Sequence, residues 1–200
     1  FTSSMAEFQA GISGSVGVYK ANGSETEATE TAQNEESGKF AYPSIFLEYN
    51  TGRVSFGLDV IPGAVESEEK GRTDYGTVDA GNDGGGNGIT HTVKVEISRH
   101  VTLYALVPIM DTGAFARIAV MRVDVETKET LGTGSTYPDT NMTGASLSLG
   151  YQHDTGGAVF VRAEVGYSDY EGISVTSSTS NKVDADVDGS WARISIGSTF

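Results

Sequence analysis

Residues 190–200 have the sequence Ser190-Trp191-Ala192-Arg193-Ile194-Ser195-Ile196-Gly197-Ser198-Thr199-Phe200. Apolar and polar side chains alternate through this stretch, which is the period-2 pattern of a β-strand with one apolar face. The apolar face holds Ala192, Ile194, Ile196 and Phe200, and the opposite face holds Trp191, Arg193, Ser195, Gly197 and Thr199. Because about 9–11 residues are enough for a tilted strand to cross a bilayer, this stretch predicts a transmembrane strand.

The composition favours a single all-β domain over residues 1–200. The chain has 26 Gly, 9 Tyr, 8 Phe and only 4 Pro, a mixture that strands and tight turns use. It has no Cys, which argues against a disulfide-stapled scaffold and a thiolate metal site. The longest apolar run, from Tyr104 to Met110, is far shorter than the roughly 20 residues that a membrane-spanning helix needs. Phe1 is not an initiator Met, so we expect a mature chain whose export signal has been removed.

The same alternation predicts eight strands, joined in turn by long polar stretches and very short turns. The predicted strands are residues 7–20, 43–49, 54–60, 93–109, 115–121, 145–151, 159–167 and 190–200. The short turns are residues 50–53, 110–113 and 154–157. The long connections, residues 21–39, 62–89, 126–140 and 171–189, carry 18 acidic and 5 basic residues, which accounts for almost all of the net charge of −14. The strands themselves are nearly neutral.

Alternating strands also build water-soluble two-sheet sandwiches, and the polar face of the strands decides between the two folds. In a sandwich the polar face meets water, whereas in a membrane barrel the apolar face meets lipid and the polar face fills the lumen. Here the polar face carries four acids and four bases among many Gly and Ser: Glu48, Asp59, Lys94, Glu96, Arg117, Arg162, Glu164 and Arg193. Such balanced charge is typical of a crowded barrel interior. On the apolar face Tyr49, Tyr151, Tyr167 and Phe200 lie at strand ends, as interfacial aromatic residues do.

The sequence therefore predicts an all-β, eight-stranded, antiparallel up-and-down transmembrane β-barrel with four long outer loops and three short periplasmic turns. The segment from Val93 to Ile109 is apolar at every second position except Arg99, which indicates one unusually long strand. The alternative is a hairpin that turns at residues 98–100. We prefer the single strand because its parity is unbroken there, and because a hairpin would give nine strands where bacterial single-chain barrels have even numbers.

Three segments carry a resemblance to a known class: Ile194-Ser195-Ile196-Gly197-Ser198-Thr199-Phe200, Ser44-Ile45-Phe46-Leu47-Glu48 and Glu129-Thr130-Leu131-Gly132-Thr133-Gly134-Ser135. With them the chain resembles small eight-stranded outer-membrane barrels of the OmpA-transmembrane and OmpX-like class, especially those of marine bacteria. The resemblance implies a bacterial outer-membrane location, periplasmic termini, and contact with outer-membrane lipid and lipopolysaccharide. It also implies that the outer-membrane assembly machinery recognises Ile194, Ile196 and Phe200. Members of the class act as structural anchors, adhesins, phage receptors or narrow channels, so no single activity is implied.

The lumen charges have a structural and a functional interpretation. An eight-stranded barrel is only just wide enough for side chains to fill it, and an unpaired buried charge costs roughly several kcal/mol, so the bases would neutralise the acids in a stabilising network. The alternative is a narrow porin-like channel for small solutes or cations, which the negative mouth would attract. Small residues on the same face would leave room for it: Gly11, Ser13, Ser15, Gly17, Ser55 and Gly57.

Two polar segments offer weaker candidates. Residues 79–88 are similar to the Gly- and Asp-rich turns that supply oxygen ligands, which makes Asp79 and Asp83 candidate ligands for Ca²⁺ or Mg²⁺. The alternative is a soluble loop tip. Residues 21–39 are rich in Glu, Thr, Ser, Asn and Gln, a composition that predicts disorder unless something orders it.

The three histidines, His91, His100 and His153, show no constellation with Ser or paired acids of the kind that catalysis requires. We therefore expect no enzyme and no resident cofactor. The net charge of −14 argues against a nucleic-acid partner, because phosphate binding needs clustered Lys and Arg. A phage or another surface ligand as partner is what the resemblance to this class implies, whereas the sequence does not indicate an oligomeric state.

Overall fold

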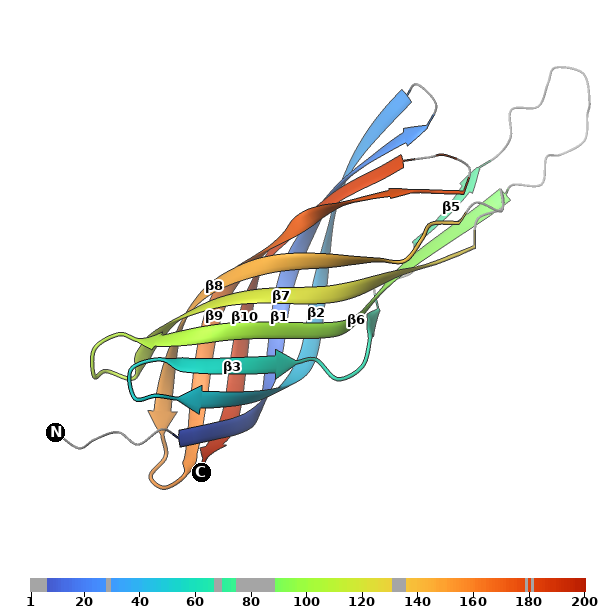
Figure 1. Ribbon diagram of the computed structural model, residues 1–200. Coiled ribbons are helices and arrows are strands. Elements are labelled where there is room, and N and C mark those ends of the chain that lie inside the picture. Colours follow the sequence, from blue (N-terminus) through green and yellow to red (C-terminus); the bar gives the residue numbers. More distant parts are fainter. Residues whose placement is uncertain are drawn as a thin grey trace, which may run out of the picture.

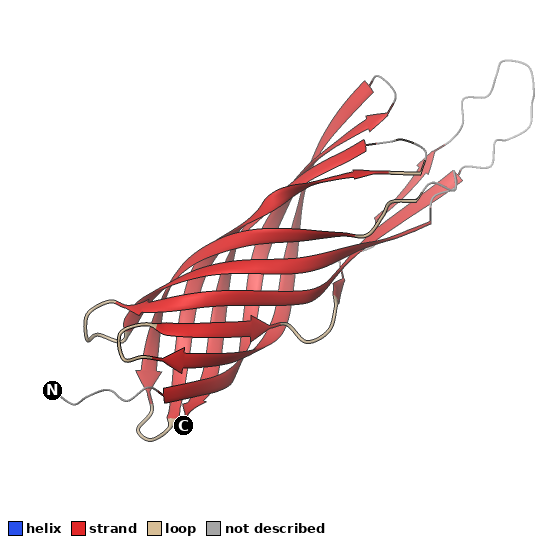
Figure 2. Ribbon diagram, viewed as in Figure 1, coloured by secondary structure: helices blue, strands red, loops and turns tan. Residues whose placement is uncertain are grey.

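The computed structural model describes residues 7–27, 30–66, 70–74, 89–130, 136–178, 180 and 182–200. Its strands are β1 (Glu7–Glu27), β2 (Glu30–Asn50), β3 (Ser55–Val60), β4 (Val65–Glu66), β5 (Lys70–Asp74), β6 (Ile89–Pro108), β7 (Ala114–Thr130), β8 (Thr140–Asp154), β9 (Val159–Thr176) and β10 (Lys182–Thr199). Figure 2 shows strands, turns and loops throughout the described part of the chain. Among the described residues no helix is long and apolar enough to cross a membrane.

Eight strand positions close into one antiparallel barrel (Figure 1). The sheet runs in the order β3-β2-β1-β10-β9-β8-β7-β6, and pairing of β3 with β6 closes it. The short strands β4 and β5 pair with β6 beyond the end of β3, so β3, β4 and β5 share one strand position. The first and last strands are neighbours, because the backbone amide of Phe8 donates to the carbonyl of Phe200 at 3.1 Å and the reverse bond is 2.9 Å. The predicted fold class is confirmed.

The start of β1, the C-terminus and the three short turns lie at one end of the barrel (Figure 1). The turns are Asn50-Thr51-Gly52-Arg53, Met110-Asp111-Thr112-Gly113 and Asp154-Thr155-Gly156-Gly157, as predicted. Each contains a glycine with positive φ, a backbone conformation that glycine adopts most readily. Each turn therefore joins two strands that are consecutive in the sequence and adjacent in the barrel: β2 and β3, β6 and β7, and β8 and β9.

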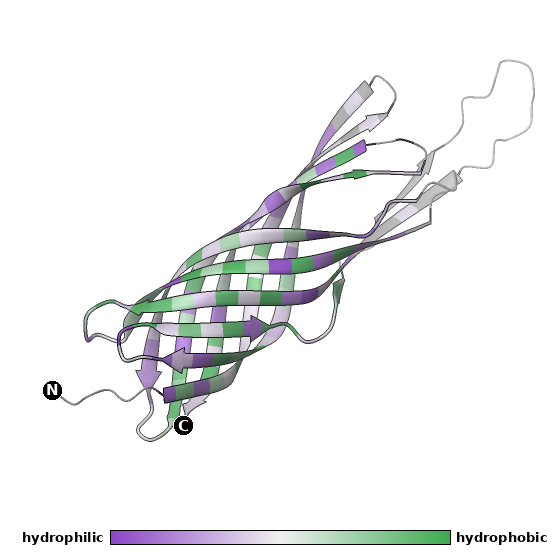
Figure 3. Ribbon diagram, in the orientation of Figure 1, coloured by the Kyte–Doolittle hydropathy of each residue, from purple (hydrophilic) through white to green (hydrophobic). Residues whose placement is uncertain are grey.

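Many of the large apolar side chains are exposed on the outside of the barrel, and Figure 3 shows hydrophobic and hydrophilic residues alternating along the strands. Ile194 on β10 is 60% exposed, whereas Glu48 on β2 is 1% exposed. A water-soluble sandwich would show the opposite pattern. The outer band of aliphatic residues matches a surface made for lipid, and the inner face is polar and charged over much of its height.

Several strands continue further than the apolar alternation predicts. β1 pairs with β2 as far as Glu27 and Glu30, and with β10 as far as Thr26 and Lys182. The prediction of disorder in residues 21–39 is therefore wrong for the part of that segment that the structure describes. The prediction failed because both faces of these strand ends are polar, so the hydrophobic alternation stops where the apolar band stops and the strand does not.

β6 is one long strand, as predicted, but its parity is broken at Arg99. The pairing with β7 steps from Ser98 opposite Asp124 to Val101 opposite Arg122, so β6 contains one extra residue. This is a β-bulge, and Arg99 has a φ of 46°. The bulge reverses the faces of the strand: Ile97 packs inward against Val123 and Val125, whereas Val101 faces outward. The prediction of unbroken parity is therefore wrong.

Candidate functional site

Six of the eight predicted lumen charges meet inside the barrel. They come from five strands and all are buried: Glu48 on β2, Asp59 on β3, Arg117 on β7, Arg162 and Glu164 on β9, and Arg193 on β10. Three are acidic and three are basic, so the cluster is formally neutral. We call these six residues the charge cluster.

The pair Glu48 and Arg162 is the most completely bonded part of the charge cluster. Arg162 Nη1 donates to Glu48 Oε1 at 2.6 Å and Nη2 donates to Oε2 at 3.0 Å, which is a bidentate arrangement. The Tyr104 hydroxyl donates to Glu48 Oε1 at 2.6 Å. Gln152 Oε1 accepts from Arg162 Nε at 3.3 Å and from Nη2 at 2.8 Å. Each of the two charged groups therefore has an oppositely charged partner and further hydrogen bonds.

The other four charges form a looser chain. Asp59 Oδ2 accepts from Arg193 Nη1 at 3.0 Å and lies 3.9 Å from Arg117 Nη2. Arg117 Nη1 donates to Glu164 Oε2 at 3.4 Å. Neutral hydroxyls complete the chain: Ser44 donates to Asp59 Oδ2 at 3.1 Å, Ser148 donates to Glu164 Oε2 at 3.2 Å, and Ser15 accepts from Arg193 Nε at 2.9 Å.

Lys94 and Glu96 do not appear in these contacts. Glu96 forms an ion pair with Lys128 of β7 instead. The bulge at Arg99 explains this difference, because it exchanges the inward and outward positions of β6 between the segment that holds Glu96 and the segment that holds Tyr104. Lys94 lies in β6 opposite Lys128, and its side chain is outside the described part of the structure.

The remaining predicted site residues belong to the assembly signal and to the candidate metal site. Ile194, Ile196 and Phe200 are exposed on the outer face of the barrel, at 60%, 50% and 71%, so their predicted orientation is confirmed and their role in assembly stays a prediction. Asp79 and Asp83 lie outside the described residues. Elsewhere in the described part of the chain, no group of three or more His, Cys, Asp or Glu is placed to hold a metal ion.

Aromatic rings fill space that the sequence pattern left to small residues. Tyr104 of β6 lies directly opposite Gly57 of β3, and a Cβ at Gly57 would approach the Tyr104 ring to 2.2 Å. Phe46 of β2 lies opposite Gly11 of β1 in the same manner, with a Cβ distance of 2.6 Å. These glycines leave room for a ring from the neighbouring strand, which occupies the space that a side chain at the glycine would need. The sequence contains a signal for this arrangement, because an inward-facing Gly on one strand pairs with an inward-facing aromatic residue on the neighbouring strand.

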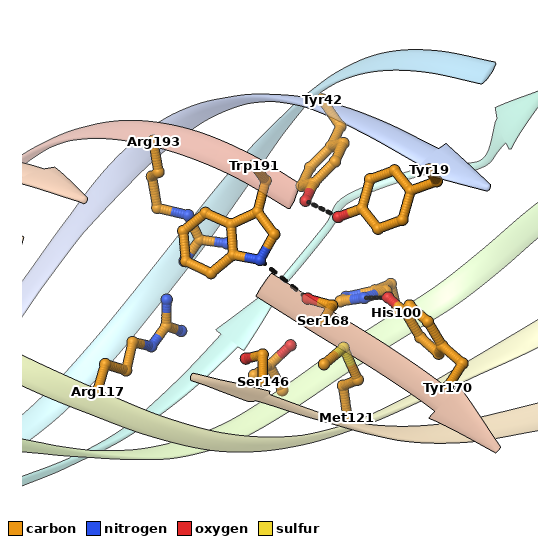
Figure 4. A pocket seen from close by; sticks show the side chains of 11 residues that line it. Tyr19, Tyr42, His100, Arg117, Met121, Ser146, Ser168, Tyr170, Trp191 and Arg193 are labelled. Atoms are coloured by element: carbon orange, nitrogen blue, oxygen red, sulfur yellow. Dashed lines mark hydrogen bonds between the residues drawn. The ribbon is translucent and has the colours of Figure 1, made fainter. Parts of the chain in front are cut away.

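Figure 4 shows a small cavity whose lining includes Arg117 and Arg193 of the charge cluster. Tyr19 and Tyr42 share a hydrogen bond of 3.2 Å beside it, and the Trp191 indole N–H donates to Ser168 Oγ at 2.9 Å. His100 Nε2 lies 3.2 Å from the Tyr170 hydroxyl. The space available to the centre of a water-sized sphere is about 10 Å³, which is about enough for a single water molecule.

Beyond this cavity the inner face becomes apolar. Val123, Val125 and Met142 form a buried cluster, and four partly buried residues pack against it: Ile97, Tyr170, Ile173 and Val187. The interior therefore has four successive parts along the barrel. The rings of Phe46, Phe115 and Phe160 lie around Arg162, and the charge cluster, the small cavity and the apolar cluster follow in that order.

The histidines do not assemble a catalytic site in the described part of the chain. The hydrogen bond of His100 goes to a tyrosine hydroxyl and not to Ser, Asp or Glu. His153 is exposed near the third short turn, and the side chain of His91 lies outside the described residues.

No protein-family model matches the chain, and no curated protein matches it. Solved structures do match. The outer-membrane protease OmpT from Escherichia coli aligns over 100% of this chain and 98% of its own, with 10% sequence identity and a TM-score of 0.51. The outer-membrane protein AlkL, determined by solid-state NMR in DMPC bilayers, aligns over 98% of this chain and 90% of its own, with 11% identity and a TM-score of 0.53.

At such low identity these similarities concern the fold alone. The chain has the fold of a bacterial outer-membrane β-barrel, and the resemblance to this class that its sequence predicts is confirmed. The resemblance to barrels of marine bacteria stays a prediction. OmpT is a protease, and nothing in its similarity extends that activity to this chain.

Proposed function

We propose that the chain is a bacterial outer-membrane barrel whose role is structural and surface-interacting, with a lumen closed by side chains and an acidic outer face presented to the medium. Its termini and short turns would lie in the periplasm. Its partners would be outer-membrane lipid and lipopolysaccharide around the barrel, the assembly machinery during insertion, and a phage or other surface ligand at the outer end. The observation that carries this proposal is the set of buried ion pairs between strands that are not neighbours in the barrel.

The charge cluster closes the lumen because its six side chains reach across it. Glu48 and Arg162 stand on strands β2 and β9, and their bidentate contact joins two parts of the wall that are not neighbours in the sheet. Asp59 on β3 contacts Arg193 on β10 in the same way. Ion pairs between non-adjacent strands connect distant parts of the wall and occupy cross-section that a solute would need. This supports the structural interpretation of the cluster.

A narrow porin-like channel receives less support. Such a channel requires a continuous path, and the small residues that would have provided it are covered, as Gly57 is by Tyr104 and Gly11 is by Phe46. Ser13 and Ser195 are buried and share a hydrogen bond of 3.0 Å across the seam between β1 and β10. The polar inner face is therefore used for contacts within the wall.

The outer end of the barrel supports the surface-interaction part of the proposal. On β1 the last large apolar residue of the outer face is Val18, and the strand continues from Lys20 to Glu27. At a rise of about 3.3 Å per residue, the eight residues from Lys20 to Glu27 extend the β1–β2 hairpin by roughly 26 Å along the strand beyond the apolar band. Its described side chains from Gln33 to Ser37 are exposed. This arm offers a polar, acidic surface that fits basic groups of a partner.

Cysteine labelling tests the proposed orientation directly, because the chain has no Cys of its own. Gln33→Cys lies on the β1–β2 arm, and Thr155→Cys lies in the third short turn; both positions are exposed. A membrane-impermeant maleimide should label Gln33→Cys on intact cells and Thr155→Cys only after the outer membrane is permeabilised. Labelling of Thr155→Cys on intact cells, with Gln33→Cys protected, would reverse the orientation and remove the proposed display of the arm.

A further inference from the structure

Among the cations of the charge cluster, Arg117 is the one with buried guanidinium nitrogens that lack a hydrogen-bond partner in the described part of the chain, although its Cζ lies 3.8 Å from the centroid of the Tyr104 ring. Its side chain is 4% exposed, yet neither Nε nor Nη2 has a hydrogen-bond partner in the described part of the chain. Its two carboxylate contacts are long, at 3.4 Å to Glu164 and 3.9 Å to Asp59. Arg162, by comparison, has two bonds to Glu48 and two to Gln152. A buried guanidinium with unused N–H groups calls for a further acceptor.

The small cavity lies where that acceptor would be needed. Arg117 and Arg193 both line it, and no Asp or Glu does. Figure 4 shows the two arginine side chains entering the cavity region beside Trp191. Both guanidinium groups approach the same oxygen, Asp59 Oδ2, at 3.9 Å and 3.0 Å. The cavity therefore has two cations on its wall, while the carboxylates that balance them lie outside it.

The neutral groups around the cavity can also donate hydrogen bonds. Ser146 and Ser168 contribute hydroxyls to the lining. The His100 ring contacts the Tyr170 hydroxyl through Nε2, and its Nδ1 is buried without a partner. When the Tyr170 hydroxyl donates to Nε2, the ring proton is on Nδ1 and adds another donor. With about 10 Å³ for the centre of a water-sized sphere, the space suits a single small species.

We propose that this cavity is a binding site for one small monovalent anion of the halide type, held by Arg117 Nε and Nη2 with Arg193 and the Ser146 hydroxyl around it. A halide accepts several hydrogen bonds and brings no proton that needs an acceptor of its own. It would lie on the cationic side of the charge cluster, because Arg117 and Arg193 line the cavity and no Asp or Glu does. Sulfate and other polyatomic anions are too large for a space of this size. The site does not depend on the proposed surface role, because it concerns the closed interior alone.

The chain contains its own reporter for this proposal, since Trp191 is its one tryptophan and lines the cavity. The folded barrel in detergent micelles would be titrated with sodium bromide, with sodium sulfate held in exchange so that ionic strength stays constant. We expect a saturable change in Trp191 fluorescence in the millimolar range. A change that is linear in bromide and never saturates would be collisional quenching and would overturn the proposal.

Two variants and a control separate the site from general effects. Arg117→Lys keeps the charge and removes Nε and Nη2, and we expect at least a tenfold weaker saturable response. Ser146→Val fills the cavity and leaves the charge cluster untouched, so it should abolish the response even if Arg117→Lys fails to fold. Arg53→Gln, at an exposed turn residue, should respond as the unmodified chain does. An undiminished response in Ser146→Val would contradict the assignment.

Crystals soaked in bromide give the direct answer. An anomalous peak between Arg117 and Ser146 would support the site. A water molecule in that position, with no anomalous signal at saturating bromide, would show that the cavity is a hydration site and overturn the proposal.

Discussion

The replacement Arg162→Met tests the energetic importance of the charge cluster most sharply. The side chain of Glu48 is 0% exposed. Arg162 is its ion-pair partner and donates one hydrogen bond to each of its two carboxylate oxygens. Methionine fills much of the volume but removes both guanidinium donors, while the Tyr104 hydroxyl still donates to Glu48. Breaking a buried pair by removing one partner costs about 3–5 kcal/mol, because a buried charge is left uncompensated. We expect a loss of that size in the free energy of unfolding.

The assay is equilibrium unfolding by guanidinium chloride of the barrel in lipid vesicles, followed by Trp191 fluorescence and extrapolated linearly to zero denaturant. Arg53→Met is the matched control, since Arg53 is exposed in the first short turn and its loss should change stability by less than about 0.5 kcal/mol. The double variant Glu48→Gln/Arg162→Met removes both charges and should recover part of the loss. A loss below about 1 kcal/mol in Arg162→Met, or no recovery in the double variant, would refute the idea that this pair is energetically coupled.

Three further outcomes follow from the same structure. Gly57→Ala should destabilise the barrel by about 1–3 kcal/mol because its Cβ would meet the Tyr104 ring at 2.2 Å. Gly14→Ala is the control, since a Cβ there has nothing within 4 Å, and it should be nearly neutral in the same unfolding assay. Equal effects of the two replacements would contradict the packing argument. Ile194→Lys should cost roughly 2–4 kcal/mol, because the side chain is 60% exposed on the lipid-facing side, and an unchanged free energy of unfolding would place this residue outside the bilayer. Phe200→Ser should slow insertion in cells while the purified variant refolds into vesicles at the normal rate, and a parallel defect in both assays would assign Phe200 a role in stability instead.

The sequence predicted those parts of the fold in which the lipid-facing side chains are apolar and the lumen-facing side chains are polar. The alternation of Arg193 and Ser195 with Ile194 and Ile196 is strong because one face is apolar and the other is not, and the structure places both faces as expected. The same reasoning could not find the ends of the strands. Around Glu35 both faces of the β1–β2 hairpin are polar, so nothing in the pattern distinguishes a paired strand from a loop.

The bulge at Arg99 shows a second limit. A one-residue insertion reverses the inward and outward faces, and the apolar residues on both sides of it keep the same spacing in sequence. The alternation in sequence therefore assigns Ile97 to the lipid face although it packs inward, and Glu96 to the lumen face although it pairs with Lys128. The apolar cluster near Val123 made this possible, because there the inner face is itself apolar.

Pairing within the charge cluster could be predicted only as a balance of charge. The sequence indicates that acids and bases share the inner face, but the choice of Arg162 for Glu48, and the incomplete bonding of Arg117, depend on the stagger of strands that are far apart in the chain. That stagger follows from the closure of β3 on β6, which is not a local property of the sequence.

Single-channel recording tests the closed lumen most directly. The purified, folded barrel would be inserted into a planar bilayer and held across gradients of cation and anion. With the charge cluster intact, we expect no discrete openings. Discrete openings from the folded, unmodified chain would contradict a closed lumen, and cation selectivity among them would make the charge cluster the filter of a narrow pore.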